Sequence, residues 1–277
     1  MVTAFAPGKC ILFGEHAVVY GQPAVAVSID AGVEVTISES SRWILEGMSF
    51  EQSKHPHISY IINDVFQYTG RPLKIDIRSG LFSAAGLGSS AALSNSMGAA
   101  LHQYTKPSEP LDLISLAKMG HSAEARAQKG RASPTDTATS ALGGCVVVSG
   151  SSPAGTKHIF DATLETPEGS RNWSVSKIEL PEIEDVWLVL GFTGIGSPTG
   201  DMVAGVSDLL KSDPIKMKEI DAIGQITHSG LRALSSGNME RVGQAMNECQ
   251  ERLRKIGVSS PELENLISAT ERHSLGT

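Results

Sequence analysis

The sequence contains few cysteines and no surplus of positive charge. Its 277 residues include three cysteines, Cys10, Cys145 and Cys249, whose odd number and scattered positions argue against a disulfide framework and against metal-ligand spacing. We therefore expect reduced, mostly buried thiols and a cytoplasmic protein. Lysine and arginine total 23 against 30 aspartates and glutamates, which gives a net charge of -7. This balance argues against a nucleic-acid-binding surface.

Long apolar runs are also missing. No uncharged apolar stretch approaches the length needed to cross a membrane. Lys9, Glu15 and His16 interrupt the apolar N-terminal stretch before a signal sequence could form. The 40% hydrophobic and 19% charged fractions are typical of a soluble globular protein. We therefore expect partners that are neither nucleic acid nor membrane.

The periodicity of apolar residues predicts a β-rich first half and a helical last part. Strands are expected at 2–6, 10–13, 24–29, 32–38, 42–46, 73–78, 145–148, 175–180 and 186–192, with a turn at Pro7-Gly8. Helices are expected at 58–68, 89–104, 111–128, 135–141, 200–211, 215–234, 239–256 and 261–273. A length of 277 residues fits about two domains. The change of pattern near Pro181 places them at 1–180 and 181–277.

The segment 84–92 (AAGLGSSAA) is typical of a phosphate-binding loop. It follows the predicted strand 73–78 and opens the predicted helix 89–104. Gly86 and Gly88 allow backbone N–H groups to approach an anion, and the helix N-terminus adds partial positive charge. Ser89 and Ser90 add hydroxyls for a helix cap or for a cation bound to phosphate.

Two other interpretations of this loop stay open on these residues alone. Its spacing also fits a dinucleotide-binding fingerprint, with Glu109 as the ribose-binding acid. However, about seven residues separate the strand from Gly86, whereas the dinucleotide turn follows its strand at once. Ala91 and Ala92 follow the serines, so there is no Walker A lysine. The second alternative is a loop whose small residues serve only packing.

Two groups of charged residues stand in unusual surroundings. Lys9, Glu15 and His16 lie in an otherwise apolar stretch, although one such residue alone is usually a snorkelling or internally satisfied side chain. Glu124 lies toward the end of a predicted helix, and Asp136 lies at a turn marked by glycine and proline. Two carboxylates separated by a turn can face one cavity, one holding a divalent cation and the other near a substrate hydroxyl. Taken singly, Glu124 would be a solvated helix residue and Asp136 a helix cap.

Together these segments resemble the kinases of the galactokinase, homoserine kinase, mevalonate kinase and phosphomevalonate kinase superfamily. Residues 13–21 (FGEHAVVYG) look like the mevalonate kinase family in particular, and residues 130–137 (GRASPTDT) are similar to its archaeal branch. Residues 199–206 (TGDMVAGV) match the place where that family carries a threonine near the substrate. The resemblance runs from residue 2 to about residue 210.

The resemblance implies an activity and a fold. The activity is ATP-dependent phosphorylation of the C5 hydroxyl of (R)-mevalonate to 5-phosphomevalonate with Mg²⁺, a step of isoprenoid biosynthesis. The fold is of the α+β class, with an N-terminal α/β domain of the ribosomal-protein S5 domain 2 type. A C-terminal α+β domain of ferredoxin-like type follows, and the site lies between the two domains. A homodimer is implied as well.

The implied roles fall on the matching positions of this sequence. Asp136 would lie beside the attacking hydroxyl, and Lys9 would contact both Asp136 and that hydroxyl. Ser90 and Glu124 would hold Mg²⁺. The mevalonate side of the site would be formed by Glu15, His16 and Thr199. The ATP phosphates would be wrapped by Ala85, Gly86, Leu87, Gly88, Ser89 and Ser90.

Two departures from the family pattern bear on these roles. Phe82-Ser83-Ala84 stands where the family often has proline before the loop. The C-terminal glycine-rich motif that would follow residues 275–277 is absent, so we expect an incomplete C-terminal domain. Two competing hypotheses stay open: a kinase for phosphomevalonate or homoserine, and a non-catalytic relative that binds ATP or a metabolite. A basic cluster for a substrate phosphate would favour phosphomevalonate, and none accompanies the matched motifs.

Overall fold

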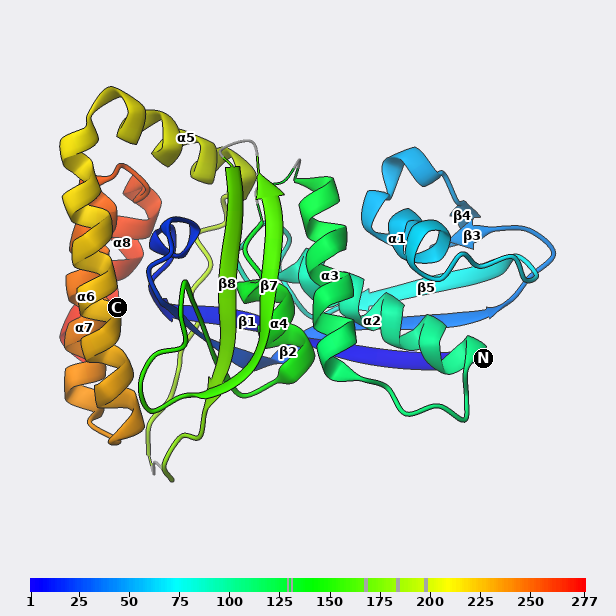
Figure 1. The fold of residues 1–277 in the computed structure, drawn as a ribbon, viewed down its shortest axis with the longest axis horizontal. Helices are drawn as coiled ribbons and strands as arrows, with labels where there is room; N and C mark the ends of the chain where they lie inside the picture. The colour runs from blue at the N-terminus through cyan, green and yellow to red at the C-terminus, as the bar shows by residue number, and fades with distance from the viewer. Residues whose placement is uncertain (129, 131, 167–168, 183–184, 197–198) are drawn as a thin grey trace.

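A mixed β-sheet with helices on both faces forms the body of the protein in a computed structural model (Figure 1). The structure describes residues 1–128, 130, 132–166, 169–182, 185–196 and 199–277. Within these residues, eight strands form one sheet in the order β4-β3-β5-β2-β6-β8-β7, with β1 paired to β2. Neighbouring strands are antiparallel except β3 and β5, which are parallel. The predicted α+β class is confirmed.

Two long strands, β1 (Val2–Phe13) and β2 (Ala24–Glu39), form the centre of the sheet. The sequence predicted two short strands in each place and a turn at Pro7-Gly8, and this prediction is wrong. Pro7 pairs with Gly32 and Lys9 pairs with Ser28, so residues 29–31 bulge out opposite Gly8 while both strands continue. A bulge absorbs the irregular residues without ending the ladder.

The other strands extend the sheet from β2. One part of β2 pairs with β5 (Leu73–Ser79) and another with β6 (Cys145–Ser149), both of which the sequence predicted. The predicted strand at 42–46 is only the short β3 (Ile44–Leu45), which pairs with β4 (Met48–Ser49). Sequence analysis missed β7 (Lys157–Thr166) and placed the start of β8 (Gly169–Ile178) too late. The interior alternation of Phe160 and Ala162 was the available signal, because both side chains are buried.

The helices of the N-terminal half cover one face of this sheet. Their predicted positions are confirmed, except that the helix expected at 58–68 is α1 (Pro56–Tyr60) followed by the π-helical η3 (Ile61–Val65). Asp112 caps α3 by accepting hydrogen bonds from the backbone N–H groups of Ile114 and Ser115. The other predicted helices are observed as α2 (Ser89–Thr105), α3 (Leu113–Ala127) and α4 (Thr135–Leu142), while the short η1 (Ala17–Tyr20) and η2 (Gln52–Lys54) were not predicted.

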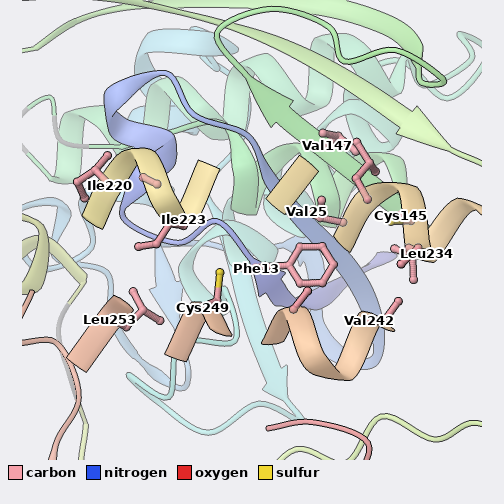
Figure 2. Packing of buried hydrophobic residues seen from close by; sticks show 14 of the residues in the cluster. Phe13, Val25, Cys145, Val147, Ile220, Ile223, Leu234, Val242, Cys249 and Leu253 are labelled. Atoms are coloured by element: carbon pink, nitrogen blue, oxygen red, sulfur yellow. The ribbon is translucent and has the colours of Figure 1, made fainter. Parts of the chain in front are cut away.

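The C-terminal helices pack on the opposite face of the sheet. Figure 2 shows Phe13, Val25 and Val147 of the sheet against apolar side chains of α6 and α7. A Cβ at Gly230 would lie 2.7 Å from the ring of Phe13, so this contact requires glycine. The predicted helices are observed as α5 (Thr199–Ser212), η4 (Pro214–Lys216), α6 (Met217–Ser235), α7 (Met239–Lys255), α8 (Pro261–Thr270) and η5 (Glu271–His273).

The strand predicted at 186–192 is wrong, because these residues form no strand and pair with no other strand in the described part of the chain. Trp187 and Val189 are 87% and 85% exposed, whereas Val186, Leu188 and Leu190 are between 40% and 47% exposed. The sequence predicted a strand here because the residues form an apolar run, but a strand also needs a neighbour for its backbone groups. Within the described residues no strand pairs with this segment. The domain boundary near Pro181 stays a prediction.

Cys10, Cys145 and Cys249 are free, and burial raises the pKa of their thiols to about 11, about 12 and about 12. Across the described ranges, no helix combines the length and the apolar character that a membrane crossing requires.

Candidate active site

The glycine loop joins β5 to α2 and has the backbone conformation that its glycines predict. Gly86 and Gly88 have φ values of 75° and 70°, in the left-handed region that favours glycine. Gly88 is the N-cap residue of α2, so no side chain caps the first N–H groups of the helix. These free N–H groups and the helix dipole form a seat for an anion.

The loop is held against β1 where this strand lies opposite the bulge of β2. The backbone N–H of Lys9 donates a hydrogen bond to the carbonyl oxygen of Leu87 at 2.9 Å. A Cβ at Gly8 would lie 2.9 Å from the same oxygen, so glycine at this position allows the close approach. The bulge therefore brings the next residue, Lys9, to the loop.

Lys9 and Asp136 form an ion pair beside the loop. Lys9 is 5% exposed, and its Nζ lies 3.0 Å from Oδ1 of Asp136. Asp136 is in the first turn of α4, and its side chain is 34% exposed. A Cβ at Gly88 would lie 3.0 Å from Cγ of Lys9 and 3.6 Å from Oδ2 of Asp136. The ammonium, the carboxylate and the anion seat thus meet at one place.

Glu15 and His16 follow β1 and precede η1, and both are half-buried. Oε2 of Glu15 and Nδ1 of His16 are buried, and neither atom has a hydrogen-bond partner within the described chain. Burial raises the pKa of Glu15, while its own backbone N–H and the nearby charge of Lys9 act in the opposite direction. Burial lowers the pKa of His16 to about 4, so its imidazole is neutral at pH 7. These atoms are suited to a polar ligand.

Glu124 is buried near the C-terminal end of α3, and this end of α3 lies near the start of α2. Gly120 of α3 lies beside Asn95 of α2, and Glu124 is one helical turn beyond Gly120. Glu124 is 4% exposed, and its Oε2 accepts a hydrogen bond from Nε2 of Gln128 at 2.5 Å. Its Oε1 lies 3.2 Å from Nε2 of His57, at an angle that does not fit a hydrogen bond.

Sequence analysis had assigned no role to Gln128 or His57. No cluster of three or more His, Cys, Asp or Glu side chains in the described residues is arranged to hold a metal ion on its own. A cation at Glu124 would therefore need oxygen atoms from another source, such as a phosphate.

The segment before α5 approaches the entry of the loop. The rings of Phe82 and Phe192 are stacked with centroids 4.9 Å apart. A Cβ at Gly196 would lie 3.0 Å from Cβ of Ala84. Thr199 begins α5, but its side chain is outside the described residues, so its predicted contact with substrate stays a prediction.

Comparisons with known proteins give the family of this chain. Residues 57–144 match the model of the GHMP kinases N terminal domain. The mevalonate kinase of Methanothermobacter thermautotrophicus is 33% identical, over 96% of this chain and 81% of its own length. That of Archaeoglobus fulgidus is 31% identical, over 98% of this chain and 86% of its own length. The chain belongs to the mevalonate kinase family.

The fold of this chain is similar to that of several solved structures. L. major mevalonate kinase in complex with R-mevalonate has a TM-score of 0.74 at 22% identity, covering all of this chain and 82% of its own. Streptococcus pneumoniae phosphomevalonate kinase in complex with phosphomevalonate and AMPPNP also has a TM-score of 0.74, at 17% identity, covering 98% and 86%. The chain is a kinase of a family that uses ATP.

Gly88→Ala is expected to lower kcat about tenfold, because the new Cβ displaces Lys9 and reacting groups tolerate little displacement. Gly47→Ala is the matched control. Gly47 also has a positive φ, 76°, but a Cβ there would meet no atom within 4 Å. The control should lose about 1 kcal/mol of stability and keep its kcat. Steady-state kinetics and thermal melts measure both; equal kcat values in the two variants would contradict the crowding argument.

His16 is expected to make the protein less stable as the pH falls from 6.5 toward 4. Burial lowers the pKa of His16 from 6.5 to about 4. Between these values the unfolded chain binds a proton that the folded chain excludes, so the free energy of unfolding rises with pH. From pH 6.5 down to 5.0 the loss from His16 is up to about 2 kcal/mol.

The measurement is the change in Tm between pH 7 and pH 5. His16→Gln should show a smaller change than the wild type, and the exposed His273 gives a control, His273→Gln, that should match the wild type. The pKa of Glu15 is shifted the other way, but Glu15 is present in all these proteins. An unchanged acid response in His16→Gln would show that His16 is not the group responsible.

Proposed function

We propose that this chain phosphorylates the C5 hydroxyl of (R)-mevalonate with ATP, giving 5-phosphomevalonate and ADP. Relatives of 33% and 31% identity over almost the whole chain are mevalonate kinases. The observation that carries the proposal is the ion pair of Lys9 and Asp136, 3.0 Å apart, with Gly88 of the loop packed against both side chains. A phosphate held by the loop and a hydroxyl held by this pair would be neighbours.

Asp136 and Lys9 are proposed to act on the acceptor hydroxyl. An alcohol is a weak nucleophile unless its proton has an acceptor, and the partly exposed carboxylate of Asp136 can accept it or orient the hydroxyl. The buried ammonium of Lys9 stabilises the negative charge that develops on the oxygen. Backbone N–H groups of residues 85–90 hold the phosphates in line with this oxygen, because phosphoryl transfer depends mainly on alignment and charge neutralisation.

Ser90 and Glu124 are proposed to hold Mg²⁺. The fit of Glu124 rests on its Oε1, which is buried and makes no hydrogen bond in the described part of the protein. A carboxylate and a hydroxyl are ligands that Mg²⁺ accepts, and phosphate oxygens usually supply others. When bound, the ion neutralises charge on the phosphates of ATP. Gln128 keeps the Glu124 carboxylate oriented through its hydrogen bond to Oε2.

Glu15, His16 and Thr199 are proposed to bind mevalonate. Mevalonate carries hydroxyl groups and a carboxylate, which can satisfy the unpartnered Nδ1 of His16 and Oε2 of Glu15. The raised pKa of Glu15 favours the protonated carboxyl group, which can donate a hydrogen bond to substrate. Thr199 enters this proposal only through its position at the start of α5.

An ADP-release assay tests the proposal. Mevalonate, phosphomevalonate, homoserine and galactose are offered separately with ATP and Mg²⁺, and ATP alone gives the background. Release that depends on mevalonate supports the proposal. Release with another acceptor would identify a neighbouring kinase, and ATP binding without release above background would identify a non-catalytic relative.

The location and assembly of the protein are part of the same proposal. The free, buried Cys145 and Cys249 support a reducing, cytoplasmic environment. The homodimer implied by the resemblance predicts about twice the 29.2 kDa chain mass in sedimentation equilibrium.

A further inference from the structure

Helices α2, α3 and α4 meet around one buried side chain, that of Asn95. Asn95 is 0% exposed, and its Nδ2 donates a hydrogen bond to the carbonyl oxygen of Thr137 at 2.9 Å. On the other side, a Cβ at Gly120 would lie 2.4 Å from Oδ1 of Asn95 and 3.3 Å from Cβ of Thr137. Only glycine at position 120 lets α3 approach this amide so closely.

Each of these helices carries a different part of the proposed site. The glycine loop opens α2, and Glu124 lies one turn beyond Gly120 in α3. Asp136 precedes Thr137 in the first turn of α4, where no side chain caps the helix. The bond from Asn95 is therefore a lateral tie between the helix of the loop and the turn that carries Asp136.

Packing alone does not account for an asparagine at this position. Its Oδ1 is buried and has no hydrogen-bond partner within the described ranges, which is unfavourable. The carbonyl of Thr137 lies inside α4, where the helix itself offers a donor four residues on. A leucine of similar shape would leave no buried polar atom unpartnered, so stability alone would favour it.

We propose that Asn95 is a positioning residue that holds the Asp136-bearing turn of α4 at a set distance from the phosphate-binding loop. This inference rests on the proposed function. Asn95 acts through the Thr137 carbonyl and touches neither substrate. Displacement of the reacting groups by about 1 Å can cost two orders of magnitude in rate, and the loss of this tie is expected to allow part of such a displacement.

Asn95→Leu tests the proposal, with Ser96→Ala as the matched control. Ser96 is equally buried in α2, but its hydroxyl bonds to Leu93 within the same helix. Asn95→Leu is expected to lower kcat about tenfold, with the Tm and the Kd for ATP close to those of the wild type. Hydrogen exchange of the 135–142 amides should become faster. The control should change none of these quantities.

A kcat within twofold of the wild type, or a loss of kcat that only parallels a fall in Tm, would overturn the proposal. Asn95→Ser is a second variant for the case that leucine does not fold: its hydroxyl is too short to reach Thr137, so the same loss of kcat is expected. If the wild type itself shows no mevalonate-dependent ADP release, the proposed function fails separately. In that case hydrogen exchange alone tests the positioning role of Asn95. Unchanged protection of the α4 amides in Asn95→Leu would overturn that role.

Discussion

Asp136→Asn is expected to lower kcat for mevalonate phosphorylation by about 100-fold or more. An amide cannot accept the proton of the substrate hydroxyl, although its oxygen can still accept a hydrogen bond from Lys9. The side chain is 34% exposed, so water can solvate the changed site and the Tm should fall little. The Kd for ATP should also stay close to the wild-type value, because Asp136 lies on the acceptor side.

A surface pair of the same composition provides the control for this variant. Asp208 in α5 lies 3.3 Å from Lys211, and its side chain is 77% exposed. Asp208→Asn is expected to keep the wild-type kcat, since an exposed pair contributes little. Steady-state kinetics at saturating ATP measure both variants. Near-normal turnover in Asp136→Asn would remove Asp136 from the proposed chemistry.

Lys9→Met is expected to lower kcat by about 100-fold or more as well, since it removes the charge that stabilises the developing alkoxide. Methionine is unbranched and flexible like the stem of Lys9, which is buried beside Gly88. The Tm should therefore fall only modestly, and Lys211→Met is the surface control. Turnover close to that of the wild type would contradict the role of Lys9.

The double variant Lys9→Met/Asp136→Asn separates one catalytic unit from two independent groups. The two side chains form an ion pair 3.0 Å long and are proposed to act on the same oxygen. Groups that act together are not additive, so the double variant should lose about as much kcat as either single variant. A loss of about 10,000-fold, the product of two separate effects, would show that the residues act independently.

Local patterns were sufficient for most helices and for the strands β5 and β6. The helices predicted at 89–104, 239–256 and 261–273 are observed nearly at those bounds. The strand predicted at 186–192 is wrong for a physical reason: its residues form an apolar run, but a strand exists only when a neighbouring strand pairs with it. The predicted turn at Pro7-Gly8 failed because a bulge in β2 kept both strands paired.

The sequence by itself determined the class of fold, the family and the residue types available for the proposed site. It also located the loop, because positive φ at Gly86 and Gly88 is a local property of glycine. Only the tertiary structure decided which residues meet. Lys9 and Asp136 are far apart in the chain, and their contact depends on the strand bulge and on the packing of α4 against α2. Asn95 carried no sequence signal at all, since a buried asparagine in a helix gains meaning only from the helices packed around it.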